Sequence, residues 1–190
     1  MPGMAADLEV LVTGYADDRV ASTVTLLRDG DLVVVVDPGM VADRSAILDP
    51  LRALGLTPEQ VSDVVISHHH PDHTINVGLF GGARVHDVMA TYERDVWTDH
   101  EPGEFVLSPS IRLVPTPGHT DQDVTTVVRT ADGIVALTHL WWGEDGPADD
   151  PFAADRDLRR RSRELVLGLR PVLIVPGHGA PFTPSARTPL

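Results

Sequence analysis

Four of the nine histidines of this chain fall within the six-residue stretch HHHPDH at positions 68–73. The useful part of this stretch is the pattern H-x-H-x-D-H, formed by His68, His70, Asp72 and His73. Side chains two residues apart on an extended chain point to the same side, so the first two imidazoles can chelate one cation while the later pair reaches a second. Imidazole and carboxylate ligands without thiolate suit zinc, iron, manganese or nickel. The stretch therefore predicts a metal site.

Three further histidines follow expected strands directly, as the 68–73 stretch does. His119 stands in PTPGHTDQD and His178 in VPGHGAPF, each after a Pro-Gly pair that ends a strand and lets the backbone turn closely. His139 ends the strand of VALTHLWW. These settings nominate all three as ligands from distant parts of the chain. His86 and His100 lack such a setting, and we expect the first on a strand face and the second in solvent. We expect His69 to point away from its neighbours, either supporting the ligands from outside or exposed.

The elements that must position these residues are strands with helices between them. Strands are expected at 8–13, 23–28, 32–36, 63–67, 84–86, 105–107, 111–115, 124–130, 134–138 and 172–175. Helices are expected at about 43–54, 74–80 and 153–169, with a capped turn at 57–60, while 91–103 gives no clear prediction. The order suggests two similar halves, each a sheet with outer helices. It predicts an α/β fold, a four-layer αββα sandwich, as one domain over residues 1–190.

Composition removes several classes of function. The chain has no cysteine, which excludes thiolate ligands and thiol nucleophiles. All fifteen basic residues are arginine, which excludes chemistry that depends on a lysine, as in Schiff-base enzymes and P-loop nucleotide hydrolases. A formal net charge of −13 disfavours nucleic acid and anionic membranes as partners. The absence of a long apolar run and of a basic leader predicts a cytoplasmic protein.

The motifs SHHHPDH, TPGHT and VPGHG, with DPG after an early strand, resemble those of the metallo-β-lactamase fold superfamily. The resemblance covers about residues 8–182 and is nearest to the small single-domain metallo-β-lactamase-domain-containing proteins. It implies two divalent metal ions at one edge of the sandwich, with zinc as first choice and iron or manganese as alternatives. The first ion would be held by His68, His70 and His119. The second would be held by Asp72, His73 and His178, with Asp72 also taking a catalytic role.

The sequence departs from this family at one ligand position. Members usually place there an aspartate that bridges the two metals, whereas this chain has His139. One donor atom of an imidazole cannot span two close ions as a carboxylate can. We favour ligation of the second metal alone by His139. Two alternatives stay open: a single metal dominates, or Asp145 or Asp149 replaces the carboxylate. The site would be more cationic, and a substrate with an anionic group would bind better.

The resemblance implies a metal-dependent hydrolase, in which a metal-bound hydroxide attacks a small ester, thioester, lactone or phosphoester. An iron-dependent, oxygen-using enzyme of the same fold, a nuclease and a non-catalytic protein are the alternatives. Trp141 and Trp142 follow His139 directly, and we expect them to bind substrate or to form a contact with a second copy. The expected partner is a small molecule and neither nucleic acid nor membrane, with a homodimer left open.

Overall fold

A computed structural model describes residues 5–153 and 155–190 of the chain. The first half contains β1 (Asp7–Val12), β2 (Tyr15–Ala16), β3 (Val20–Ala21), β4 (Val24–Asp29), β5 (Leu32–Val36), α1 (Ser45–Ala53), the 3-10 turn η1 (Pro58–Gln60), β6 (Asp63–Val65), α2 (Pro71–Thr74), η2 (Val77–Phe80) and β7 (Arg84–His86). The second half contains β8 (Ala90–Glu93), β9 (Val96–Asp99), β10 (Phe105–Val106), β11 (Ile111–Pro115), β12 (Val124–Thr130), β13 (Gly133–Thr138), α3 (Arg156–Gly168) and β14 (Leu173–Pro176).

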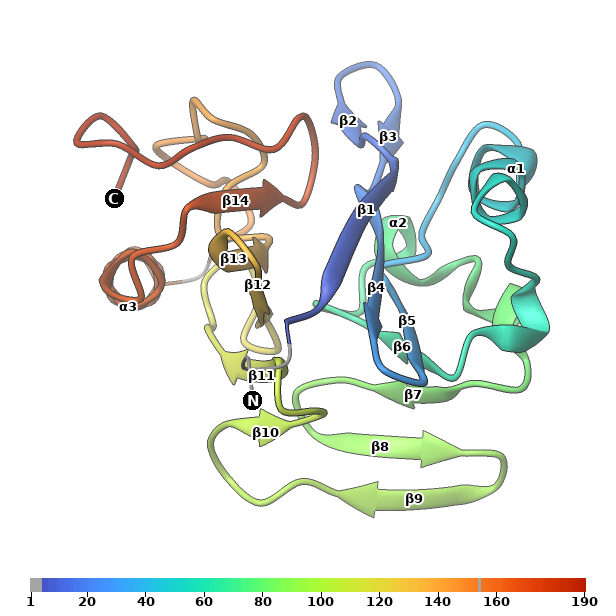
Figure 1. Cartoon of the computed structure of the whole chain (residues 1–190). Coiled ribbons are helices and arrows are strands. Elements are labelled where there is room, and N and C mark those ends of the chain that lie inside the picture. The colour runs from blue at the N-terminus through green and yellow to red at the C-terminus, as the bar shows by residue number, and fades with distance from the viewer. Residues whose placement is uncertain (1–4, 154) are drawn as a thin grey trace.

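Two sheets face each other, and helices lie outside both (Figure 1). The seven-stranded sheet has the order β1-β4-β5-β6-β7-β8-β9, and the five-stranded sheet has the order β10-β11-β12-β13-β14. Helix α1 lies on the outer side of the first sheet and α3 on the outer side of the second. This is the αββα sandwich that the order of elements predicts. No helix in the described part of the chain is long and apolar enough to cross a bilayer.

Alternation along single strands builds the layers. Val34 and Val36 of β5 join the core between the two sheets, whereas Val35 between them packs with Ile47 and Leu51 of α1. Successive side chains of a strand point to opposite faces, so an uninterrupted run of valines is expected where both faces are covered. The second sheet repeats this arrangement, because a third core joins its outer face to α3.

The local predictions had different outcomes. The expected loop at 68–73 turns into α2 at Pro71, which stands at a first helical position where its missing N–H is not needed. The segment 91–103, which gave no clear prediction, belongs largely to the β8–β9 hairpin. The 57–60 turn is confirmed as a capped 3-10 turn, in which the Thr57 N–H donates to Gln60 Oε1 at 2.9 Å.

The pairing of strands brings the ends of four of them to one edge. Strands β5 and β6 are parallel neighbours, as are β13 and β14. Backbone hydrogen bonds then join the two sheets there: the Val124 N–H donates to Ser67 O at 2.9 Å, and the Thr23 N–H donates to Gly177 O at 2.8 Å. The residues that follow these strands are therefore held close together, including the 68–73 stretch, His139 and His178.

Candidate metal centre

Six histidines that the sequence nominates as ligands meet at this edge. Two groups of imidazole nitrogens each lie within 4.8 Å of one another, namely His68, His119 and His139, and His73, His139 and His178. The Nδ1 atom of His70 lies 3.0 Å from the Nε2 atoms of both His68 and His119. A neutral imidazole carries one N–H, so three converging nitrogens cannot all be satisfied by one another. Their lone pairs suit a shared cation.

Asp72 joins the second group. Its Oδ2 atom lies 3.4 Å from His73 Nε2 and 3.5 Å from His178 Nε2. These separations exceed those of charge-assisted hydrogen bonds, and His73 Nε2 is buried with no hydrogen-bond partner. An unpartnered nitrogen in a buried site points to an absent ligand of that atom. The donor set of two imidazoles and one carboxylate fits a divalent metal here.

The Nδ1 atoms of two of the histidines form hydrogen bonds with carboxylates. Asp37 Oδ2 lies 2.9 Å from His73 Nδ1, and Asp150 Oδ2 lies 2.7 Å from His119 Nδ1. A carboxylate only accepts, so the proton of each imidazole must sit on Nδ1. The Nε2 lone pair of each ring is then directed at the site. Such outer partners fix the tautomer and orientation of a ligand and raise its basicity.

The Nδ1 atoms of two other histidines contact uncharged groups. His178 Nδ1 donates to the Ala21 carbonyl at 2.8 Å, which again leaves Nε2 free. His68 Nδ1 lies 3.1 Å from Ser67 Oγ, a group that can donate or accept. The Ser67 N–H in turn donates to Asp37 Oδ1 at 2.7 Å. The same aspartate thus fixes the start of the 68–73 stretch and orients a histidine near its end.

Gly39, in the DPG motif, allows α2 to approach. A Cβ atom at this position would lie 1.6 Å from the carbonyl oxygen of Asp72, which also accepts from the Met40 N–H at 3.0 Å. No side chain fits in that space, so only glycine permits the contact. The motif therefore sets the position of Asp72 through the backbone.

Burial and charged neighbours together set the pKa values of the side chains at the centre. Burial and the neighbouring histidines lower the pKa values of His68 and His139, whose exposed fractions are 1% and 2%. Both rings therefore stay neutral and able to bind a cation. Burial acts the same way on His73, but the charge and hydrogen bond of Asp37 outweigh it and raise the pKa of His73. Burial would raise the pKa of Asp150, yet the His119 hydrogen bond lowers it.

His139 occupies the position where the sequence departs from the family pattern. It belongs to both histidine groups, and its ring stacks on that of His119 with centroids 4.2 Å apart. Its Nδ1 atom has no hydrogen-bond partner, and a Cβ at Gly177 would lie 2.8 Å from it. The backbone thus closes one edge of the ring. Asp145 and Asp149 are exposed and belong to neither group.

The two tryptophans after His139 lie in different environments. Trp141 has no exposed surface, donates from Nε1 to the Pro189 carbonyl at 2.9 Å, and lies under the Arg163 guanidinium. It is part of the core below α3, which corrects the expectation that it binds substrate or contacts a second copy. The Trp142 ring flanks the site, with its centroid 5.9 Å from that of His119 and 6.0 Å from that of His178.

Sequence reasoning missed three residues beside His119. Asp150 is described above, and Asp123 Oδ2 accepts from the His119 N–H at 2.6 Å. Phe152 places its ring centroid 5.4 Å from that of His119. The sequence offers Asp145 and Asp149 of the acidic loop 144–150 as sources of a carboxylate, but the aspartate of this loop that contacts a candidate ligand is the neighbouring Asp150.

The other histidines take structural roles. His69 turns away from the centre and pairs with Asp87 at 2.9 Å. His86 is buried, with Nε2 2.7 Å from Asp63 Oδ1. His100 was expected in solvent, but its ring stacks on Phe105 at 3.8 Å, so that expectation was wrong.

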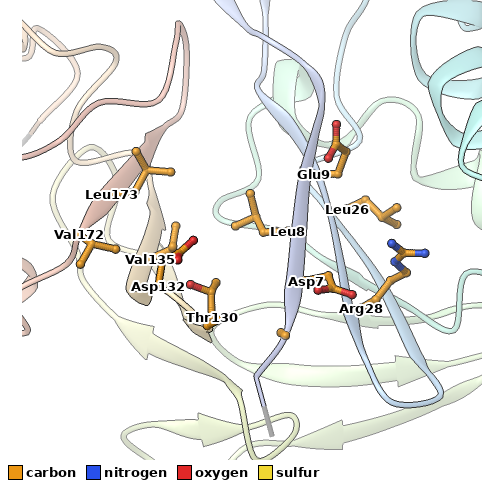
Figure 2. A pocket seen from close by; sticks show the side chains of 12 residues that line it. Asp7, Leu8, Glu9, Leu26, Arg28, Thr130, Asp132, Val135, Val172 and Leu173 are labelled. Atoms are coloured by element: carbon orange, nitrogen blue, oxygen red, sulfur yellow. The ribbon is translucent and has the colours of Figure 1, made fainter.

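Hollows of different chemistry occur on the surface. One of about 280 Å³ is walled partly by His70 and His119. A larger one of about 710 Å³ lies between β1 and the β13–β14 edge, where Figure 2 shows Leu8, Val135 and Leu173 facing one another. No histidine lines the larger hollow. Volume therefore does not locate the site, whereas the convergence of ligands does.

Comparison with known proteins gives a consistent family. The profile of the Metallo-beta-lactamase superfamily matches residues 17–112. A Xenopus laevis protein, metallo-beta-lactamase domain-containing protein 1, is 31% identical over 96% of this chain and 83% of its own length. The human protein of that name is 38% identical over 78% of this chain, which spans 59% of the human length. An N-acyl homoserine lactonase of Bacillus cereus is 24% identical over 73% of this chain and 64% of its own length.

Solved structures share the fold. A Thermotoga maritima protein assigned to the metallo-beta-lactamases aligns with a TM-score of 0.74 at 21% identity, covering 95% of this chain and all of that one. A quorum-quenching N-acyl homoserine lactone lactonase aligns with a TM-score of 0.67 at 20% identity, covering 94% of this chain and 93% of that one. The αββα sandwich is therefore the one that these proteins adopt.

Proposed function

Because the chain belongs to the metallo-beta-lactamase superfamily, we propose that it is a metal-dependent hydrolase of a small ester, thioester, lactone or phosphoester. The observation that carries the proposal is the convergence of six histidines and Asp72 at one edge of the sandwich. Relatives named as lactonases support hydrolysis as the class of reaction. We propose a small molecule as the substrate and the cytoplasm as the location.

We propose two divalent cations as cofactors, zinc first. Imidazole nitrogens with one carboxylate are ligands that zinc prefers in catalytic sites. His68, His70 and His119 would hold one cation, and Asp72, His73 and His178 the other. His139 offers one usable nitrogen to the site, since Gly177 closes the Nδ1 edge of its ring. It would therefore ligate one cation only, and we assign it to the second.

When bound, the two cations would lower the pKa of a water and polarise the oxygen of the scissile group. The protein supplies the orientation of the ligands. Asp37 and Asp150 hold two imidazoles with Nε2 inward, so no ring has to turn on binding. Asp72, of which 17% of the side chain is exposed, would accept the proton that the attacking water loses.

Elemental analysis of the purified protein, followed by a panel of thioesters, lactones and phosphodiesters, tests the proposal. We expect a transition metal, zinc first, and hydrolysis in at least one class of the panel. Treatment with a chelator should abolish that hydrolysis, and return of the metal should restore it. The matched control is H69A, which removes a neighbouring histidine that pairs with Asp87 outside the centre. Hydrolysis that survives complete metal removal would contradict the proposal, as would an inert metal-loaded protein.

A further inference from the structure

The hollow beside the metal centre has a lining that discriminates between substrates. It measures about 280 Å³ and is bounded by His70, Gly118, His119, Thr120, Asp121, Phe152, Asp155 and Leu158. Two of these are candidate ligands, so the hollow adjoins the proposed metal centre and can receive a group of a molecule bound there. The volume lies just below the roughly 300 Å³ at which sites for whole drug-sized ligands begin. The hollow therefore has room for one group of a substrate.

An aromatic ring forms the apolar part of the lining. Phe152 is 64% exposed, although its ring lies 6.1 Å from Trp142 in a stacked arrangement and 6.2 Å from His70. Leu158 of α3 adds an aliphatic surface. An exposed aromatic face beside a reactive centre binds apolar groups, and it also attracts organic cations through the charge distribution of the ring.

The charged side chains of the lining are acidic. Asp121 and Asp155 are both exposed there. None of the eight described residues that bound the hollow is an arginine, and the chain has no lysine. One N–H group at the N-terminus of α3 is already engaged, because the Leu158 N–H donates to Asp155 Oδ1 at 2.9 Å. An anionic group in the hollow would meet repulsion from the carboxylates of Asp121 and Asp155, and no arginine or lysine side chain of the described residues lines the hollow to offset it.

Two arginines lie close to the hollow without lining it. Arg156 pairs with Asp149 at 2.6 Å, and both side chains are exposed. Arg159 is buried behind Gly118 and donates to the Ala148 carbonyl at 2.6 Å. The charge of Arg159 also helps to lower the pKa of Asp150, after the larger effects of burial and hydrogen bonding on that carboxyl. Neither guanidinium is among the groups that line the hollow.

We propose that the substrate group held in this hollow is apolar and either uncharged or cationic, and that an anionic group is rejected there. The inference rests on the proposed function, because the hollow is the space next to the proposed metal centre. Phe152 provides the contact surface, and Asp121 sets the preferred charge. The sequence-based expectation of an anionic substrate is thereby replaced for the part of the molecule that lies beyond the scissile bond.

Three para-substituted benzohydroxamates test this on the metal-loaded protein as purified. All share one metal-binding head group and differ only in the distal tert-butyl, trimethylammonium or carboxylate group. Calorimetry should show the first two binding about three- to ten-fold more tightly than the carboxylate. F152A should weaken binding of the tert-butyl and trimethylammonium compounds about three- to ten-fold and leave the affinity for the carboxylate compound nearly unchanged. D121N should reduce the difference in affinity between the trimethylammonium and the carboxylate compounds, and added salt should do the same.

Matched controls come from the β8–β9 hairpin, which lies at the end of the molecule opposite α2 (Figure 1). W97A removes another exposed aromatic ring and E93Q another exposed carboxylate, so both should leave the three affinities unchanged. The inference would be overturned by equal affinities for the three compounds, by tighter binding of the carboxylate compound, or by no binding of any of them. The expected order without hydrolysis of any substrate would refute the proposed function alone. Hydrolysis combined with the reverse order would refute this inference alone.

Discussion

Replacing Asp150 with asparagine removes the negative charge behind His119 and keeps the size of the side chain. The Asp150–His119 contact is 2.7 Å long, and Asp150 is only 4% exposed, so water cannot take over its role. The same carboxylate accepts from the Phe152 N–H at 2.9 Å, which fixes its orientation. Loss of such a partner typically weakens metal binding 10- to 100-fold, or about 1.4–2.8 kcal/mol. We expect D150N to lose affinity within this range.

Competition with a chromogenic chelator measures this affinity directly. The matched control is D149N, since Asp149 is the preceding residue but is exposed and paired with Arg156. It should change metal affinity less than two-fold. If D150N also stays within two-fold of the original protein, the carboxylate does not support His119 as a ligand. The reasoning from outer partners to metal affinity would then be refuted for this site.

Three further predictions concern the same site. G39A should displace α2, because the added Cβ would lie 1.6 Å from the Asp72 carbonyl oxygen; metal content should fall well below that of the original protein, and an unchanged content would argue against the role of this contact. H139D should tighten the weaker metal site at least about ten-fold in chelator titrations, because a carboxylate can bridge two ions; equal metal counts and affinities in both proteins would exclude this. In metal-free protein, burial lowers the pKa values of His68 and His139, so only the unfolded chain takes up protons below about pH 6.5. The free energy of unfolding should then fall by about 2 kcal/mol between pH 6 and pH 5. His73, whose pKa is raised, acts in the opposite sense and mainly above pH 6.5. Equal free energies of unfolding at both pH values, measured by chemical denaturation, would show that the two rings are not buried in the neutral form.

The ligands were predictable because their positions follow from chain geometry. The nominated histidines lie in segments that follow β6, β11, β13 and β14, and strands that run in the same direction end at the same edge of a sheet. The layers were predictable for a similar reason: the valine run of β5 requires cover on both faces. The irregular 3-10 turn η2 and the β8–β9 hairpin lacked such periodicity, and the predicted helix at 74–80 was misplaced by several residues.

The supporting residues were not predictable in this way. Asp150 is separated from His119 by 31 residues and stands next to Asp149, and nothing in the acidic loop distinguishes the buried carboxylate from the exposed one. The adjacent Trp141 and Trp142 could not both face one direction, but which of them enters the core depends on Arg163 and the C-terminal segment. These choices are made by tertiary packing, which a local pattern does not record.

Anomalous diffraction from crystals of the purified, metal-loaded protein tests the central claim most directly. The account predicts two anomalous peaks at the absorption edge of the bound metal. One should lie among His68, His70 and His119, and the other among Asp72, His73 and His178, with His139 directed at the second. Peaks elsewhere, or ordered solvent between histidines that bind no cation, would contradict it.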